Sequence, residues 1–318
     1  MNKEKKVWVV RKLVMKMKET LDDKITLSEK SIDLPRNGVI EKIALLFNLT
    51  LKNAGSSEWS GTYEDVLKAI EEIRVVADAN DTKYALNGLD VAIMNYYDSA
   101  SKSVKLSDSI TVPASGTKNI SFLLFLDAGE IHAVAKESLK LYVSFNTSVA
   151  ENITIDNAEV VVTLDKLVFE DANEWVAYYS GIFVEPKVWT KEKSFEQLNE
   201  LADFMNIPTG AIAWRGFLTT YNDSGARADL IDKYAIIQTK PRRIDLMKVD
   251  WNTSKQLDKV EYKLDSVLEG VSVIDYDKEL VEGGFDLRDA GTGTFKLALK
   301  TTGAGKVRYI SHELVVLE

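Results

Sequence analysis

Apolar residues recur at every second position along much of the chain, which is the pattern of a strand with one buried face. Between residues 43 and 51 every odd position is apolar, and the same alternation returns at residues 139–145 and 295–299. Two other runs, at residues 120–126 and 160–164, are almost continuously apolar. Such runs predict strands that are covered on both faces.

Shorter runs rich in β-branched and aromatic residues predict further strands. They lie at residues 73–76, 91–94, 212–218, 234–237, 244–249, 260–264, 271–274 and 307–310. Clusters of Gly, Pro, Asn and Ser separate these runs and supply turns. So many short strands predict an all-β protein built from sandwiches or jelly rolls.

Two segments show helical spacing instead. At residues 64–73 the apolar positions share one helical face. At residues 194–205 a similar apolar stripe follows Ser194, which forms a capping-box pattern with Gln197. The sequence therefore predicts a few short helices among the strands.

An internal repeat organises the chain. Pro35 and Pro208 each precede a predicted strand; Asp65 and Asp229 follow it, and Gly116 and Gly291 lead into a later strand at nearly the same offset. The repeat predicts two similar β-domains, at residues 25–172 and 173–318, after an arm at residues 1–24. Two unrelated β-domains with similar turn chemistry are the alternative.

Charge is concentrated at the N-terminus. The chain has 318 residues and a net charge of -9, yet its first eighteen residues carry seven basic groups and one acidic group. The basic groups, with one tryptophan among them, are Lys3, Lys5, Lys6, Trp8, Arg11, Lys12, Lys16 and Lys18. Such an arm on an acidic body predicts contact with an anionic membrane or with DNA. A solvated tail, or an edge strand protected by lysines, is the alternative.

The sequence lacks the residue types that several kinds of chemistry require. The chain has no cysteine and only two histidines, His132 and His312, which excludes thiol catalysis, disulfides, cysteine-ligated metals and multi-histidine sites. Carboxylates are numerous, but no pair is singled out as catalytic. No apolar run is long enough to span a bilayer. We therefore expect no enzyme, no cofactor and no bound metal.

Specific stretches of the first half resemble a known family. The motif Asp33-Leu34-Pro35-Arg36-Asn37-Gly38-Val39-Ile40 precedes the strand at residues 43–51, and residues 65–77, Asp81, Asn87-Gly88-Leu89-Asp90 and Tyr96-Tyr97 follow it. In these residues the chain is similar to the double jelly-roll major capsid proteins of icosahedral double-stranded DNA viruses. This lineage includes the adenovirus hexon and the capsid proteins of membrane-containing tailless phages and of turreted archaeal viruses. The resemblance is clearer for residues 35–170 than for the second half.

The resemblance implies a fold and a role. The fold would be all-β, with two tandem eight-stranded jelly-roll β-sandwiches and a few short helices. The protein would be a structural virion protein that forms homotrimers of pseudo-hexameric outline and tiles an icosahedral shell. Its partners would be itself, other virion proteins such as vertex proteins, and the inner membrane or packaged DNA through the arm, with no small-molecule substrate. It would reside in the virion and assemble in the host cytoplasm.

Two further sets of residues are candidates for surface roles. Seven Asn-X-Ser/Thr sequons occur where composition predicts about two. Those near turns are candidates for N-glycosylation: Asn80, Asn146, Asn152, Asn222 and Asn252. The alternative is that turn asparagines simply precede strands rich in Ser and Thr. Trp59 lies in a long turn-rich stretch and is a candidate contact between subunits.

A second function class stays open at this stage. A secreted β-sandwich protein that binds or cleaves carbohydrate would have the same strand pattern. A sugar-binding platform would gather its aromatic residues on one face. The six tryptophans are instead scattered through both halves and the arm, which favours assembly over carbohydrate binding.

Overall fold

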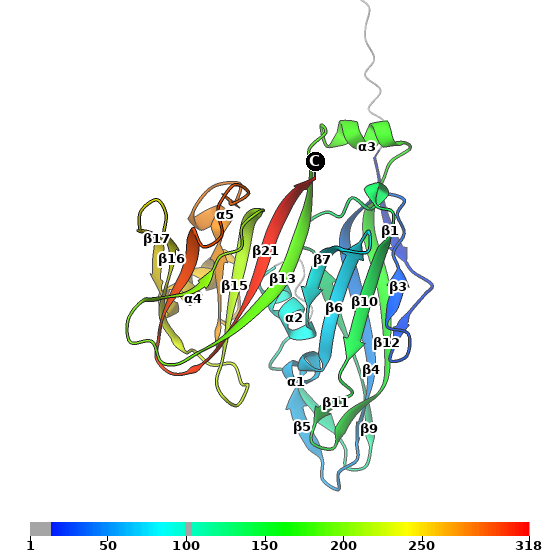
Figure 1. The fold of residues 1–318 in the computed structure, drawn as a ribbon. Coiled ribbons are helices and arrows are strands. Elements are labelled where there is room, and N and C mark those ends of the chain that lie inside the picture. The colour runs from blue at the N-terminus through cyan, green and yellow to red at the C-terminus, as the bar shows by residue number, and fades with distance from the viewer. Residues whose placement is uncertain (1–13, 99–103, 318) are drawn as a thin grey trace, which may run out of the picture.

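Each half of the chain folds its strands into a two-sheet sandwich, and the two sandwiches lie side by side (Figure 1). The structure is a computed structural model that describes residues 14–98 and 104–317. Most of these residues are in strands, as the alternation predicted.

The first sandwich contains eight strand positions in two sheets. One sheet has the order β1-β12-β4-β9 and the other β7-β6-β10-β3. The first strand position is split into β1 and β2, both of which pair with β12. The strands are β1 (Met15–Thr20), β2 (Ile25–Thr26), β3 (Ser31–Asp33), β4 (Val39–Asn53), β6 (Ile70–Ala77), β7 (Asp81–Leu86), β9 (Thr117–Leu126), β10 (Leu139–Phe145) and β12 (Ile153–Val168).

The second sandwich repeats this arrangement. Its sheets have the orders β13-β21-β15-β18 and β14-β20-β16-β17. The strands are β13 (Phe183–Phe195), β14 (Ala202–Asn206), β15 (Ile212–Tyr221), β16 (Ile231–Gln238), β17 (Ile244–Asp250), β18 (Val271–Asp275), β20 (Phe295–Thr301) and β21 (Gly305–Leu317). In both halves one sheet joins the first, eighth, third and sixth strands and the other joins the second, seventh, fourth and fifth. This is the jelly-roll connection, and the prediction of two eight-stranded jelly rolls is confirmed.

Short elements complete the two rolls. The helices are α1 (Tyr63–Lys68), α2 (Gly88–Tyr97), the 3-10 helix η1 (Ala133–Ala135), α3 (Ala172–Tyr178), α4 (Trp251–Glu261) and α5 (Tyr276–Glu279). The minor strands are β5 (Trp59–Thr62), β8 (Ser109–Val112), β11 (Ser148–Ala150) and β19 (Phe285–Asp286). In Figure 1 α3 crosses one end of the molecule, between the last strand of the first roll and the first strand of the second.

The repeat that predicted this duplication is only partly right. Pro35 and Pro208 both precede the third strand of their roll, β4 and β15. Asp65 and Asp229 both lie between the third and fourth strands, but Asp65 is in α1, which the second roll lacks. The third match is wrong, because Gly116 precedes the sixth strand and Gly291 precedes the seventh. Glycine turns recur throughout β-proteins, so similar turn chemistry is a weak marker of equivalence.

The inner faces of the sheets form the core of each roll. Along β4 the buried positions alternate with half-buried ones, so Phe47 points inward, where it stacks on Phe122 of β9 at 5.2 Å between ring centroids. The runs at 120–126 and 160–164 also alternate, with Leu123 36% exposed and Val161 half-buried. The prediction that both faces of these strands are covered is therefore wrong within one chain. Their outer faces are nevertheless partly apolar, through Leu123, Phe125 and Val161.

Several predicted elements are of the wrong type. The helix expected at 194–205 is the end of β13, a turn and β14, because β13 pairs with β21 along its whole length and this pairing overrides local helical spacing. The strands expected at 91–94 and 260–264 belong to α2 and to α4 with the turn after it. A short apolar run does not distinguish a buried helix from a strand. The helix expected at 64–73 ends at Lys68, and β6 begins at Ile70.

Helices α2 and α4 have equivalent positions in the two rolls. Each connects the fifth strand to the sixth and closes the side of the sandwich between them. From α2, the side-chain oxygen of Asn95 accepts a hydrogen bond from Phe125 N of β9 at 2.8 Å. From α4, the carboxylate of Asp258 accepts one from Val273 N of β18 at 3.0 Å. The two side chains therefore make the same contact with the edge of the sixth strand.

The carboxyl group of Asp258 differs from the amide of Asn95 in being ionisable. Asp258 is 3% exposed. Burial raises its pKa from 3.8 to about 7, against the hydrogen bonds from Val273 N and Ser272 Oγ, which favour the charged form. Because the folded state binds the proton more tightly than the unfolded chain, this group contributes stability at low pH, and that contribution is lost as pH rises from about 4 through 7.

Replacing Asp258 with Asn should therefore stabilise the protein at pH 8. Asn keeps the acceptor oxygen and removes the buried charge, so we expect the free energy of unfolding at pH 8 to rise by roughly 2–4 kcal/mol and its pH dependence between 5 and 8 to flatten. Urea denaturation at several pH values measures both. The matched control is Asp156→Asn, at a side chain that is 51% exposed, which should change neither. An unchanged or lower stability of Asp258→Asn at pH 8 would contradict the account.

Candidate functional site

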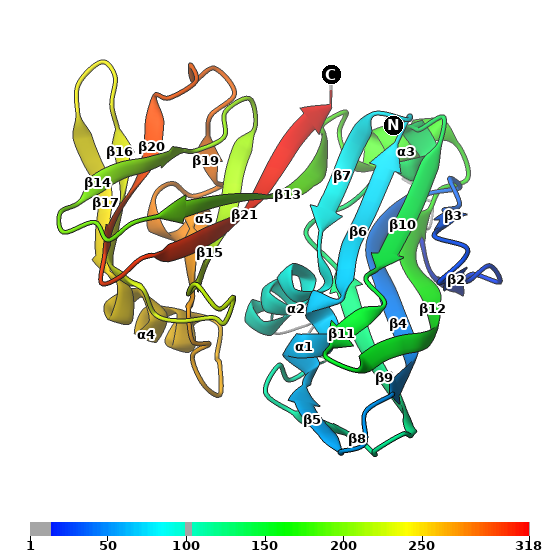
Figure 2. The same ribbon diagram turned by 60° about the horizontal axis from the view of Figure 1, so that its bottom comes forward.

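The two rolls are joined through the edge of one sheet. Strand β13 of the second roll pairs in parallel with β7 of the first, through Val188 with Tyr84 and Trp189 with Ala85. This pairing merges one sheet from each roll into a nine-stranded sheet. Figure 2 shows β13 passing beside β7, with α2 lying between the rolls. We call this contact between the two rolls the junction, and it is the candidate functional site of the molecule.

Apolar packing extends from the first roll across the junction. Tyr97 of α2 lies edge-on to Phe217 of β15 at 5.9 Å and to Tyr262 at 5.6 Å. Val188 and Ile310 of the second roll belong to the same buried cluster as the core of the first roll. A continuous core of this kind fixes the two rolls relative to each other, because separating them would expose large aromatic surfaces to water.

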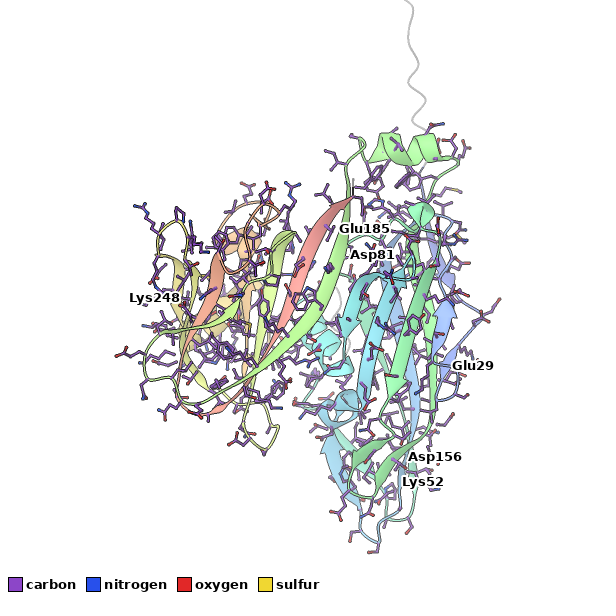
Figure 3. The ribbon with its side chains drawn as sticks, viewed as in Figure 1. Glu29, Lys52, Asp81, Asp156, Glu185 and Lys248 are labelled. Carbon is purple, nitrogen blue, oxygen red and sulfur yellow. The ribbon has the colours of Figure 1, made fainter. Side chains whose placement is uncertain are left out.

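A buried carboxylate lies in the same junction. Glu185 of β13 has no exposed surface and forms ion pairs with Lys83 of β7 and with Lys136, the latter at 2.8 Å. Its other oxygen accepts a hydrogen bond from His132 N at 2.9 Å. Figure 3 shows Glu185 on β13 facing Asp81 at the start of β7. Burial alone would lower the pKa of Lys83, but the carboxylates of Asp81 and Glu185 outweigh it and raise that pKa.

Both histidines of the chain also connect the parts of the junction. His312 of β21 donates from Nε2 to Ala128 O of the first roll at 2.6 Å. His132 accepts a hydrogen bond at Nδ1 from Trp175 Nε1 of α3 at 3.0 Å. Burial lowers the pKa of His132 to about 4 and that of His312 to about 3, so both are neutral near pH 7. Both side chains therefore act here as neutral hydrogen-bonding partners that connect parts of the junction.

Ion pairs at the rim of the junction complete it. Arg308 of β21 binds both carboxylate oxygens of Asp90 on α2, at 2.7 and 2.6 Å. Arg227 binds Glu64 of α1, at 3.0 Å from its Nε. Burial of Glu64 would raise its pKa, but the hydrogen bond and charge of Arg227 outweigh this and lower it. Two parallel hydrogen bonds from one guanidinium fix orientation as well as distance.

The structure describes only part of the predicted basic arm. Lys16 and Lys18 lie on β1, whose pairing with β12 makes it part of the first roll. They form exposed ion pairs with Glu41 at 3.3 Å and Asp165 at 3.2 Å. The arm residues Lys3, Lys5, Lys6, Trp8, Arg11 and Lys12 lie outside the described residues. The boundaries at 24 and 172 stay predictions.

The candidate glycosylation residues have mixed settings. Asn80, Asn146 and Asn152 are exposed in turns, as expected. Asn222 is half-buried and its side-chain oxygen accepts hydrogen bonds from Ser224 and Ala226, whereas Asn252 is exposed near the start of α4. The other two sequons are in strands, where Asn48 and Asn119 bond to Ser121 and Thr50 across the sheet. Their modification stays a prediction.

Trp59 lies in the two-stranded sheet β5-β8 and not in an open loop. It pairs with Val112 between β5 and β8, and its half-buried ring packs against the core of the first roll. The ring also lies over Gly61, where an added Cβ would overlap it. The role of Trp59 as a contact between subunits stays a prediction.

The described residues contain neither a metal-binding cluster nor a membrane-spanning helix. No cluster of three or more His, Asp or Glu side chains there is arranged to hold a metal ion. No helix among those residues is long and apolar enough to cross a membrane. The sequence alone did not single out Glu185 among the 49 acidic residues of the chain. The signal that could have indicated its burial is its position between the apolar residues Val184 and Pro186, in a predominantly apolar stretch.

Comparisons with known proteins identify the fold through similar solved structures, but not through a similar sequence. No family model matches the chain, and no curated protein sequence matches it. Among solved structures, the chain is similar to the STIV MCP, with a TM-score of 0.85 and 19% identity over 95% of this chain and 97% of that one. A chain in the atomic structure of Sulfolobus turreted icosahedral virus gives a TM-score of 0.82 and 20% identity over 94% and 90%.

A more distant structure has the same fold. The major capsid protein of bacteriophage PM2 gives a TM-score of 0.60 at 12% identity, over 96% of this chain and 98% of that chain. Because each match covers nearly the whole of both chains, the similarity includes both jelly rolls and their arrangement. The chain therefore has the double jelly-roll fold.

The buried carboxylate of the junction gives a testable prediction. Glu185→Gln would leave Lys83 and Lys136 buried with only the more exposed Asp81 as their counter-charge, so we expect the free energy of unfolding to fall by about 3 kcal/mol. Chemical denaturation at pH 7 measures the loss. The control Glu29→Gln changes an exposed carboxylate and should have almost no effect. Equal stability of the two variants would show that Glu185 does not hold the junction.

Proposed function

We propose that this protein is the major capsid subunit of an icosahedral virus. The observation that carries the proposal is the rigid pairing of two jelly rolls with identical strand order, in the same arrangement as in the capsid proteins it resembles. A subunit made of two similar blocks offers similar corners to its neighbours. Three such chains present six blocks around one axis, which suits a homotrimer of pseudo-hexameric outline.

The proposal extends to the surroundings of the subunit. Its main partner is a second copy of itself, followed by other virion proteins such as vertex proteins. Its location is the virion, after assembly in the host cytoplasm. We propose no enzymatic activity, cofactor or small-molecule substrate. A secreted protein that binds or cleaves carbohydrate is not favoured, since Trp175, Trp189 and Trp251 donate hydrogen bonds within their own chain.

The N-terminal arm is proposed to contact an anionic surface. Lys16 and Lys18 at its base are paired with acidic side chains of the first roll, so the charge available to a partner comes from the residues before them. An inner membrane and packaged DNA both offer such a surface. Glycosylation of exposed sequons and a contact role for Trp59 belong to the same proposal.

The mass of the protein in solution tests the capsid proposal. We expect light scattering to give three times the 35.6 kDa of one chain, and electron microscopy to show particles with a hexagonal outline. A monomer at all concentrations, with no larger assembly under any condition, would contradict the proposal.

Removal of residues 1–13 tests the arm. This deletion spares β1, so the unfolding free energy should stay the same. Attachment to anionic vesicles or to duplex DNA at low salt should weaken, and high salt should abolish the difference because it screens the charges. Co-sedimentation with vesicles and a DNA mobility shift identify which surface is bound. Equal binding of the full-length and shortened proteins to both would refute the arm's role.

A further inference from the structure

Helix α4 has two exposed apolar residues on one face. Leu257 is 48% exposed and Val260 is 76% exposed, although both are large aliphatic side chains. A neighbouring face of α4 is buried on its own roll through Trp251, Ser254 and Asp258. Residues three apart share a helical face, so Leu257 and Val260 form one apolar patch.

The equivalence of α2 and α4 identifies what this patch corresponds to. Asn95 and Asp258 make the same contact with the sixth strand of their rolls. One residue before them lie Met94 and Leu257, and two residues after them lie Tyr97 and Val260. In α2 these positions are buried, with Met94 8% and Tyr97 1% exposed. The same positions in α4 are apolar and exposed.

The second roll is what covers α2. Tyr97 packs on Phe217, a residue on the outer face of β15, and its hydroxyl lies 3.4 Å from Val271 O of β18. Phe217 pairs with Val273 of β18 on one side and with Ile310 of β21 on the other. The receiving surface of the junction is therefore the outer face of the sheet β13-β21-β15-β18.

The first roll has the same surface in its sheet β1-β12-β4-β9. Ala44 of β4 pairs with Phe125 of β9 and with Thr163 of β12, as Phe217 pairs with Val273 and Ile310. The next outward position, Leu46, pairs with Leu123 and Val161. This outer face is apolar at Ala44, Leu46, Leu123, Phe125 and Val161, all half-buried or exposed. Sheet faces that stay in water are normally polar at alternate positions.

The edge strands of the two rolls show the same difference between a paired position and its unpaired equivalent. Within the chain, the fifth strand of the first roll, β7, pairs with the first strand of the second, β13. Among residues 14–98 and 104–317, the corresponding strands without a partner of this kind are β17 and β1. In the described part of the chain β17 pairs only with β16, and β1 only with β12. Unpaired edges of this kind are sites where another chain adds.

We propose that the junction within the chain is repeated between copies. Leu257 and Val260 of α4 dock on the outer face of β12, β4 and β9 of a second copy, and the edge of β17 approaches β1 of that copy. Each chain then gives α4 to one neighbour and receives α4 from the other. This is a head-to-tail contact, which closes into a ring when the rotation between blocks permits it. The inference rests on the proposed capsid function and specifies the contact.

Chemical cross-linking tests this contact without background, because the chain has no cysteine. Ala44→Cys and Val260→Cys place thiols at the counterparts of Phe217 and Tyr97. With a short bismaleimide, the double variant should give covalent dimers and trimers on a denaturing gel. A mixture of the two single variants should stop at dimers, since each chain then has one thiol. The control pair is Ala44→Cys with Ile182→Cys, a residue 65% exposed after α3, which should stay uncross-linked.

The outcomes separate the two proposals. If the wild-type protein is trimeric by light scattering and the pair at 44 and 260 does not cross-link, the contact is wrong while the capsid role stands. If the wild type is monomeric in every condition, the capsid role fails and the contact fails with it. Cross-linking of the control pair as efficiently as the test pair would also overturn the contact.

A charge substitution supplies a second readout. Val260→Asp should convert the oligomer to monomers and leave the unfolding transition unchanged, because the side chain is exposed in the single chain. Val281→Asp, at an apolar residue 49% exposed after α5, should leave the mass unchanged. An unchanged mass for Val260→Asp would contradict the docking of α4.

Discussion

The structure depends on the fixed contact between its two jelly rolls. The parallel pairing of β13 with β7, a shared apolar cluster and the buried carboxylate of Glu185 hold this contact together. A buried carboxylate is costly unless it is fully paired, and here two lysines and a backbone N–H satisfy it. Such a group tolerates only one arrangement of the strands that carry its partners. It therefore specifies how the rolls lie and adds orientation to the apolar packing, which alone is less directional.

Duplication of a fold does not duplicate its surroundings. In the first roll the helix between the fifth and sixth strands is covered by the second roll, while in the second roll the equivalent helix is open (Figure 2). Conversely, the outer face of the sheet β13-β21-β15-β18 is covered by the first roll, while within the described residues the outer face of β1-β12-β4-β9 is half-buried or exposed. The chain thus contains one complete junction between its rolls. It also presents, on α4 and on the outer face of β1-β12-β4-β9, the two kinds of surface that form such a junction. A chain built in this way is suited to join copies of itself in one direction.

The alternation of apolar and polar residues predicted strands with one buried and one more exposed face, such as β4. The prediction of two jelly rolls followed from the order of the internal repeat and from the family resemblance. Prediction from local spacing failed where pairing with a distant strand determines the secondary structure. Residues 194–205 have helical spacing, yet β13 extends through Phe195 because β21 pairs beside it. The junction was not predictable, because it joins Glu185 to Lys83 and Lys136 from distant parts of the chain. The exposed apolar position of Val260 was also hidden, since residues 260–264 resembled a strand.

The most direct measurement is a cryo-electron microscopy reconstruction of the oligomer at a resolution that separates strands. The account predicts three chains around one axis, with α4 of each chain on the outer face of β4 and β12 of the next. It also predicts that one rotation relates neighbouring jelly rolls both within and between chains. A map in which α4 faces solvent, or in which the chains meet through different faces of the rolls, would contradict the account.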